Sequence, residues 1–324
     1  MRILQVPGGG FRCFAFSPDG RWLATGHEGG ALRLWDPRAG AVAAVSESRS
    51  RGLLHVAVSP DGTRVAARGA YELLLWEIRP SPGGVELCPS WRGWRWFPPG
   101  GFPGWEARTI PDVGSEKCLS FSPDGRALIF PSADPSHPGV CVLPLDGEAL
   151  FTRPIARGEW IQDAAFHPDG RTLAVASDHR ASLWDWEPSP GPAGGRAGEA
   201  CRATFAHPDH VTRLCFSGDG RRLATLAGRT LRVWDVEARE CVREITPSRK
   251  AITAAALSPD GRLAATAFVN HKDLRLWDVE TGRERARFAF SVGAIPHLAF
   301  SPDGLTAAAG GSARKLVVWD VDAG

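Results

Sequence analysis

The chain has 324 residues, a formal net charge of +2 and 43% hydrophobic residues. This composition is that of a soluble globular protein, and the near-neutral charge excludes any whole-protein argument for an oppositely charged partner. Residues 1–6 lack the basic and apolar regions of a signal peptide, and no run reaches the roughly 18 apolar residues that span a bilayer.

A four-residue turn, Ser-Pro-Asp-Gly or a close variant, recurs seven times along the chain. The copies begin at Ser17, Ser59, Ser122, His167, Ser217, Ser258 and Ser301. Each follows an apolar strand and precedes a second small apolar strand and a third strand that ends in Trp-Asp or a relic of it. A period of about 40–45 residues is what four short strands with their turns require. Because Pro presets the second turn position and Gly suits the fourth, each copy predicts a type I turn.

The third strands follow in chain order behind these turns. Six of them carry a tryptophan near their end, at Trp35, Trp76, Trp184, Trp234, Trp277 and Trp319. The third unit lacks this residue, and the constant spacing to the next unit places Leu143 there. The fourth strands, such as Cys241–Thr246 and Glu284–Phe288, are the most polar, as expected for an exposed outer edge.

Two units are longer than the repeat requires. We place an insertion at about residues 79–104 in the second unit and another at about 187–198 in the fourth. Both are predicted to lie between the third and fourth strands. The fourth strands are then Glu106–Ile110 and Arg202–Phe205. The second insertion is rich in Pro and Gly and is typical of a flexible linker.

These turns and the Trp-Asp or Trp-Glu endings resemble the WD-repeat β-propeller family over essentially the whole chain. The resemblance implies an all-β fold in one domain, residues 1–324: a seven-bladed β-propeller of four-stranded antiparallel blades. It also implies that residues 1–6 pair with Lys315–Trp319 and close the ring. The family's buried histidine and aspartate are mostly missing, with Asp178 and His207 as relics, so most blades are expected to depend on apolar packing.

The sequence offers little for catalysis or metal binding. The turn aspartates (Asp19, Asp61, Asp124, Asp169, Asp219, Asp260 and Asp303) are spread around a ring rather than paired, so they are interpreted as turn residues. The seven cysteines lack CxxC spacing, which indicates neither disulfides nor zinc and fits a reducing, cytoplasmic compartment. His207 and His210 alone make a weak metal site. We expect no cofactor, no metal and no enzymatic activity.

The insertion in the second unit is the one stretch that the repeat does not explain. Residues 91–105, which include its end and the residue after it, contain four of the 13 tryptophans. The candidate partner-binding residues are Trp91, Arg92, Trp94, Arg95, Trp96, Phe97 and Trp105. Trp and Arg dominate interface hot spots, so the insertion is a candidate epitope for a protein partner. The alternative is that the loop folds over the propeller and buries its own aromatic side chains.

These observations predict a non-enzymatic scaffold for protein–protein interaction, monomeric and cytoplasmic, that binds another protein or peptide and no membrane. One alternative is a propeller enzyme acting in the central channel. The apolar innermost strands Cys13–Phe16, Ala164–Phe166 and Ala254–Leu257 argue against it. The other is binding of nucleic acid or another anionic ligand by Arg and Trp, with bases stacked on tryptophan and phosphates on Arg92 and Arg95.

Overall fold

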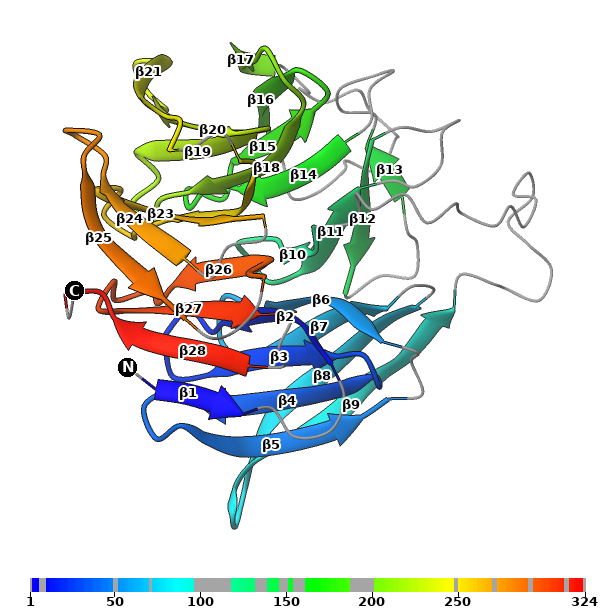
Figure 1. Ribbon diagram of the computed structural model, residues 1–324. Helices are drawn as coiled ribbons and strands as arrows, with labels where there is room; N and C mark the ends of the chain where they lie inside the picture. The colour runs from blue at the N-terminus through cyan, green and yellow to red at the C-terminus, as the bar shows by residue number, and fades with distance from the viewer. Residues whose placement is uncertain are drawn as a thin grey trace.

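The computed structural model describes residues 2–5, 10–48, 52–69, 72–95, 118–131, 139–145, 151–153, 161–186, 201–247, 250–269, 273–290, 294–311 and 315–322. Within these ranges, 28 strands form seven four-stranded antiparallel sheets. The sheets stand as blades around a common centre (Figure 1). The predicted all-β, seven-bladed propeller is confirmed.

Each blade runs from an innermost to an outermost strand. Blade 1 contains β2 (Phe11–Phe16), β3 (Leu23–His27), β4 (Ala31–Asp36) and β5 (Ala41–Glu47); blade 2 contains β6 (Leu53–Val58), β7 (Arg64–Gly69), β8 (Glu72–Ser81) and β9 (Gly84–Arg95); blade 3 contains β10 (Ser120–Phe121), β11 (Ala127–Pro131), β12 (Val140–Pro144) and β13 (Phe151–Arg153); blade 4 contains β14 (Ile161–Phe166), β15 (Thr172–Ser177), β16 (Arg180–Asp185) and β17 (Cys201–Ala206).

The remaining blades follow the same order. Blade 5 contains β18 (Val211–Phe216), β19 (Arg222–Ala227), β20 (Thr230–Asp235) and β21 (Glu240–Ile245); blade 6 contains β22 (Ile252–Leu257), β23 (Leu263–Phe268), β24 (Asp273–Asp278) and β25 (Glu284–Ala289); blade 7 contains β26 (His297–Phe300), β27 (Thr306–Gly311), β28 (Lys315–Asp320) and, outermost, β1 (Arg2–Gln5).

The first strand closes the ring as predicted. β1 pairs antiparallel with β28, with Arg2 opposite Val318 and Gln5 opposite Lys315. Leu4 packs with Trp35 of blade 1 in one apolar cluster, so the closing strand also contacts the neighbouring blade. The two ends of the chain are therefore tied together in a single sheet.

The apolar core lies between neighbouring blades. Second strands such as β3, β15 and β23 are buried along their whole length, whereas the outer strands β21 and β25 are largely exposed. This explains why the inner strands are apolar on both faces, since each large side chain fully buried contributes about 1.5–3 kcal/mol. The prediction for blade 3 is confirmed: Leu143 lies opposite Leu128, as Trp184 lies opposite Leu173.

The seven repeated turns form a ring on one face. In every copy the glycine N–H donates to the carbonyl of the first turn residue, at 2.8–3.0 Å, and the glycine φ lies between +67° and +74°. Each turn also packs against the turn of the preceding blade. A Cβ on Gly220 would lie 2.4 Å from Nε2 of His167, and one on Gly261 would lie 2.8 Å from Cγ of Arg222. The positive φ therefore favours glycine in every turn, and at Gly220 and Gly261 the neighbouring blade also leaves no room for a Cβ.

Blade 2 differs from the sequence prediction. Its third and fourth strands, β8 and β9, form one long hairpin that turns tightly at Pro82–Gly83, with Ser81 opposite Gly84. The fourth strand is thus Gly84–Arg95, and the prediction of a fourth strand at Glu106–Ile110, after an insertion, is wrong. Residues 96–117 lie outside the described ranges. In blade 4, β17 contains the predicted Arg202–Phe205, and residues 187–200 are likewise outside.

Candidate functional site

The turn aspartates are engaged within their own turns. In the six copies that begin with serine, the serine Oγ donates to the aspartate Oδ1 at 2.5–2.6 Å. The Ser301 hydroxyl, the Leu305 N–H and the nearby Arg38 together lower the pKa of Asp303. These carboxylates therefore serve as hydrogen-bond acceptors within their turns and are not paired for acid–base chemistry.

The repeat tryptophans retain more polar pairing than predicted. Five indole Nε1 groups donate to a serine or threonine hydroxyl at 2.7–2.9 Å; the pairs are Trp35–Thr25, Trp76–Ser46, Trp184–Ser182, Trp234–Thr225 and Trp277–Thr266. The Nε1 of Trp319 is buried without a partner. The expectation that most blades depend on apolar packing is corrected, because a threonine or serine hydroxyl still pairs with the indole, from the same blade in four cases and, for Trp76, from Ser46 of the neighbouring blade.

Two histidines are buried beside arginines. His27 in blade 1 is fully buried and hydrogen bonded to Thr25 at 3.0 Å, and burial, with Arg33 nearby, lowers its pKa to about 4. His207 accepts a hydrogen bond from Arg232 of blade 5 at 3.0 Å, and burial followed by Arg232 lowers its pKa to about 4. Both rings are therefore neutral near pH 7.

The weak metal candidate, His207 with His210, is not assembled. His207 faces Arg232, whereas the ring of His210 lies 4.3 Å from that of His179 and its Nδ1 lies 3.9 Å from a carboxylate oxygen of Asp178. Among the described residues, no group of three or more His, Cys, Asp or Glu side chains could hold a metal ion.

The innermost strands contain a carboxylate that the sequence analysis missed. Asp163 on β14 is 8% exposed, and its oxygens accept the N–H groups of Ala164 at 3.0 Å and of Leu214, on the next blade, at 2.9 Å. Thiols make similar links: Cys13 donates to the Leu53 carbonyl, and Cys118 donates to that of Ala164. Burial raises the pKa of Cys13 to about 12. These polar groups connect neighbouring blades.

The predicted partner-binding residues fall partly on a regular strand. Trp91, Arg92, Trp94 and Arg95 belong to β9, where Trp91 is opposite Leu75, Trp94 opposite Leu73 and Arg95 opposite Glu72. Four of the seven candidates are thus brought together on one outer strand rather than in a loop. Trp96, Phe97 and Trp105 lie outside the described residues.

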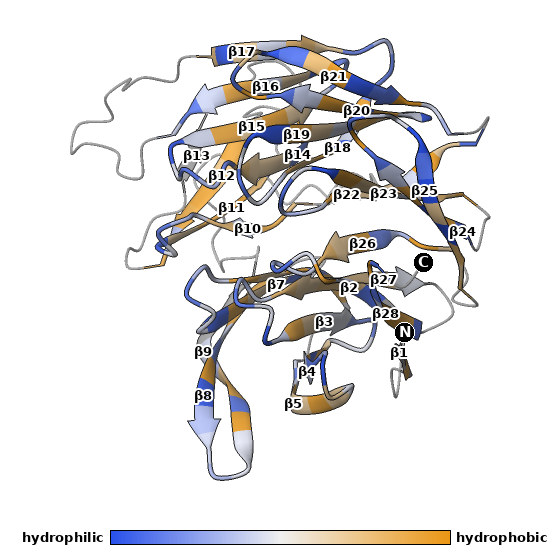
Figure 2. Ribbon diagram, turned by 90° about the vertical axis from the view of Figure 1, so that its left-hand side faces the viewer, coloured by the Kyte–Doolittle hydropathy of each residue, from blue (hydrophilic) through white to orange (hydrophobic). Residues whose placement is uncertain are grey.

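The hairpin that contains these residues projects from the ring at its opposite end, where it turns at Pro82–Gly83. β8 has 10 residues and β9 has 12, and their tip extends away from the other blades (Figures 1 and 2). Ile78, Val85 and Leu87 pack with Ala44 and Trp22 of blade 1, which holds the hairpin against its neighbour. Around the tip, Arg79, Pro80, Pro82 and Glu86 are exposed. A turn-forming Pro-Gly pair between two strand-like runs was the sequence signal for this hairpin.

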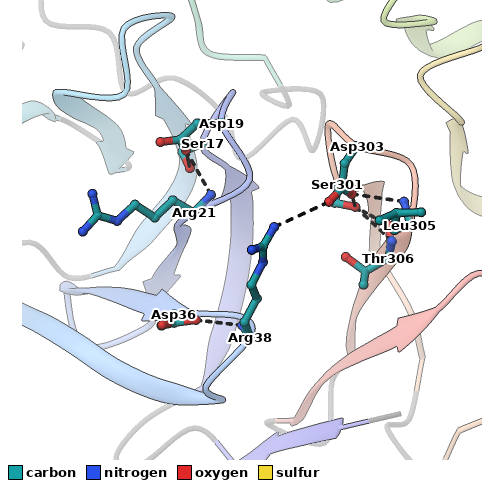
Figure 3. A network of polar contacts seen from close by, with 9 residues as sticks. All are labelled: Ser17, Asp19, Arg21, Asp36, Arg38, Ser301, Asp303, Leu305 and Thr306. Carbon is teal, nitrogen blue, oxygen red and sulfur yellow. Dashed lines mark hydrogen bonds and ion pairs between the residues drawn. The ribbon is translucent and has the colours of Figure 1, made fainter.

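A pocket opens where the ring closes, between blades 7 and 1. It has a volume of about 480 Å³ and is lined by Gly20, Pro37, Arg38, Ser301, Asp303, Leu305, Thr306, Val318, Trp319 and Asp320. Arg38 of blade 1 reaches toward Asp303 of blade 7 across this seam, at 3.9 Å (Figure 3). Its backbone N–H donates to Asp36 at 2.8 Å. The sequence analysis did not identify this pocket.

A family model described as "WD domain, G-beta repeat" matches the chain at residues 2–36, 153–185, 199–235 and 239–278. The β-propeller domain of Cps50 (Swd1) from Myceliophteria thermophila aligns with a TM-score of 0.76 and 15% identity. That alignment covers 98% of this chain and 99% of that domain. At this identity the structural likeness shows the fold alone.

Sequence relatives match over shorter regions. An uncharacterized WD repeat-containing protein of Synechocystis sp. is 24% identical over 44% of this chain and 38% of its own length. A probable cytosolic iron-sulfur protein assembly protein 1 of Cryptococcus neoformans is 29% identical over 44% of this chain and 25% of its own length. The matched region thus spans well under half of these relatives. The described residues contain no helix that could cross a membrane.

Proposed function

The chain is a WD-repeat β-propeller, and from this premise we propose that it is a non-enzymatic scaffold that binds another protein or peptide through the β8–β9 hairpin of blade 2. The observation that carries the proposal is the length of this hairpin. The other outer strands have three to seven residues, whereas β9 has 12, and its end near Pro82–Gly83 projects beyond the ring. A repeat scaffold needs a feature that differs between its blades in order to bind a partner, because the fold alone does not determine function.

The residue types on β9 support a protein partner. Tryptophan and arginine are the residues that most often dominate the binding energy of protein interfaces. Trp91, Arg92, Trp94 and Arg95 follow one another along the strand, and Trp96, Phe97 and Trp105 extend the same candidate site by sequence. An outer strand also offers free backbone groups to an extended partner.

The polar groups nearest the centre support a scaffold more than an enzyme. Both oxygens of Asp163 accept backbone N–H groups, and the thiols of Cys13 and Cys118 donate to carbonyls of neighbouring blades. A general acid or base needs a free position toward a substrate. We also propose that the protein is a cytoplasmic monomer, in keeping with its seven cysteines, which lack CxxC spacing.

A capture experiment with purified protein tests this function. The wild-type chain and the double variant Trp94→Ala/Trp96→Ala are immobilised, exposed to lysate of the source cells, and compared by mass spectrometry. We expect a reproducible protein partner on the wild type and at least a tenfold loss on the variant, with the same thermal midpoint. Glu240→Ala, an exposed change on the outer strand of blade 5, is the matched control and should retain the partner.

Two outcomes contradict the proposal. If the double variant unfolds at much lower temperature, the tryptophans are packing residues of blade 2. If nucleic acid is recovered instead, with an affinity that falls steeply with salt, the arginines bind phosphates and the scaffold assignment is wrong.

A further inference from the structure

Among the described residues, most of the exposed large apolar side chains belong to blades 7 and 1. Among the described residues, the large hydrophobic side chains that are exposed are Val42 (37%), Val45 (50%), Val269 (39%) and Leu305 (63%). Val42 and Val45 lie on β5 of blade 1, and Leu305 lines the pocket of blade 7. Three of these four thus belong to the two blades that meet where the ring closes.

The outer strand β5 lacks the charges that protect an exposed edge. Its first six residues, Ala41–Ser46, carry no charge, and much of the strand is coloured as hydrophobic in Figure 2. The outer strands of blades 5 and 6, by contrast, read Glu-Cys-Val-Arg-Glu-Ile and Glu-Arg-Ala-Arg-Phe-Ala. Charged side chains on an edge strand discourage pairing with another chain, so β5 is the more open of these edges.

A buried arginine lies directly beneath this edge. Arg33 on β4 is opposite Val45, and Trp35 is opposite Val42, so the two valines flank Arg33 on the same face of the blade. Arg33 is only 9% exposed, and its Nη1 has no hydrogen-bond partner. Leaving a buried guanidinium group without a carboxylate is costly, since the charge has lost most of its water.

The equivalent arginines in blades 5 and 6 show what is missing. Arg232 is opposite Glu244 on the outer strand, and their side chains form an ion pair at 2.8 Å. Arg275 forms an ion pair with Glu284 of its outer strand at 3.4 Å. Blade 1 has Val45 in the place of Glu244. His27, the titratable neighbour of Arg33, is a base and cannot supply the negative charge.

We propose that the outer edge of blade 1 binds an extended, acidic and apolar segment of a partner protein. The backbone of this segment pairs with the free edge of β5, an aspartate or glutamate side chain reaches Arg33, and apolar side chains cover Val42 and Val45. This inference rests on the proposed scaffold function and adds a second contact surface to it, distinct from the β8–β9 hairpin.

Because Arg33 needs a carboxylate, the segment that binds the edge of β5 is identified as acidic. A second copy of the chain pairing through β5 would bring six uncharged residues, Ala41–Ser46, and a single carboxylate, Glu47, at the end of the strand. A basic segment would place like charges together. An acidic segment supplies in trans the carboxylate that Glu244 supplies within blade 5.

Two synthetic peptides test the proposal. Both are fluorescein-labelled ten-residue peptides, one alternating valine with glutamate and the other alternating valine with lysine. Fluorescence anisotropy at 0.15 M salt measures their affinity for the full chain. We expect the glutamate peptide to bind at least tenfold more tightly than the lysine peptide.

Three variants localise the binding. Val45→Glu copies the residue that blade 5 has at this place, so it should pair with Arg33 within the chain and weaken the glutamate peptide at least tenfold. Arg33→Leu should remove the preference for glutamate over lysine. Val269→Glu makes the same substitution at an exposed valine of blade 6 and should leave peptide affinity unchanged.

The inference is wrong if the two peptides bind equally, or if Val45→Glu binds the glutamate peptide as the wild type does. A concentration-dependent dimer that Val45→Glu dissociates, measured by analytical ultracentrifugation, would assign the edge to a second copy and overturn the acidic segment. If the peptides fail while Trp94→Ala/Trp96→Ala still abolishes partner capture, only this inference fails and the scaffold function stands.

Discussion

Blades 1 and 5 contain the same polar residues on their third and second strands but differ on their outer strand. In each blade a tryptophan indole donates to a threonine, at 2.9 Å for Trp35 in blade 1 and 2.8 Å for Trp234 in blade 5. In each blade an arginine two positions before the tryptophan, Arg33 or Arg232, lies beside a buried neutral histidine; His27 ends β3 of blade 1, whereas His207 follows β17 of blade 4. Only in blade 5 does the outer strand supply a carboxylate to the arginine.

The difference shows where a repeat can change without losing its fold. The inner strands are constrained by packing on two neighbouring blades, so Thr25 and Thr225 keep the same pairing with their tryptophans. The outer strand is exposed, and replacing a glutamate by Val45 there alters the surface rather than the ring. Outer strands are therefore where the surface can diverge between blades, as the sequences of β5 and β9 both illustrate.

Acidification should destabilise the fold by a similar amount through His27 and through His207. This loss of stability should be larger than that from substituting Thr25, Thr225 or Glu244. Because folding lowers the pKa of His27 and His207 from 6.5 to about 4, the folded state binds fewer protons than the unfolded state between these values. Stability is therefore full above about pH 6.5 and is lost as pH falls toward 4. The loss is roughly 2–3 kcal/mol per histidine.

Urea unfolding at pH 7.5 and pH 4.5 measures this loss. The variants His27→Gln and His207→Gln should each remove about half of the pH dependence that the two histidines cause. Equal pH dependence in the wild type and both variants would contradict the buried, neutral state of these rings.

Loss of the tryptophan–threonine hydrogen bond should destabilise blade 1 slightly more than blade 5. Thr25→Val and Thr225→Val each leave an indole N–H without its acceptor, at a cost of about 1–3 kcal/mol. Thr25→Val should be the more costly, because Thr25 is also hydrogen bonded to His27. Thermal unfolding compares both with Thr246→Val, an exposed control on blade 5 that should change stability by less than about 0.5 kcal/mol. Three equal effects would argue against the pairing.

Removing one carboxylate should give blade 5 the arrangement of blade 1. Glu244→Gln takes the ion-pair partner from Arg232, whose side chain is 14% exposed, whereas that of Glu244 is 52% exposed. Because the carboxylate is largely solvated, the expected loss of stability is only about 1 kcal/mol. Thermal unfolding should show this loss shrinking in 1 M salt; a loss independent of salt would mean that packing, not charge, was removed.

The sequence predicted those parts of the fold that the repeat period controls. The placement of Leu143 follows from spacing, and the ring closure through residues 2–5 follows from the resemblance to the WD-repeat family; the structure confirms both. The fourth strand of blade 2 was mispredicted because a constant connection to the next blade was assumed. In the structure, β8 and β9 instead continue up to a tight turn at Pro82–Gly83. The number of residues in a repeat unit cannot distinguish a longer hairpin from a loop inserted between two strands.

The candidate site was less accessible to sequence reasoning. Composition indicated Trp91 and Arg92 as unusual residues but not that they lie on a strand. The position of Val45 opposite Arg33 depends on a register shift between Leu34 and Trp35, which the pattern of residues does not reveal. Asp163 was missed because the sequence shows only a single carboxylate in an apolar strand. That it accepts N–H groups from two blades cannot be predicted from this pattern.

The most direct test of the contrast between the blades is a double-mutant cycle in blade 1. The unfolding free energies of the wild type, Arg33→Leu, Val45→Glu and the double variant are measured by urea denaturation at pH 7.5. If Arg33 lacks a carboxylate, Val45→Glu should stabilise the wild type but not the Arg33→Leu background, with a coupling of about 1 kcal/mol or more. A coupling indistinguishable from zero would contradict the account, since Arg33 would then gain nothing from the carboxylate that blade 5 provides.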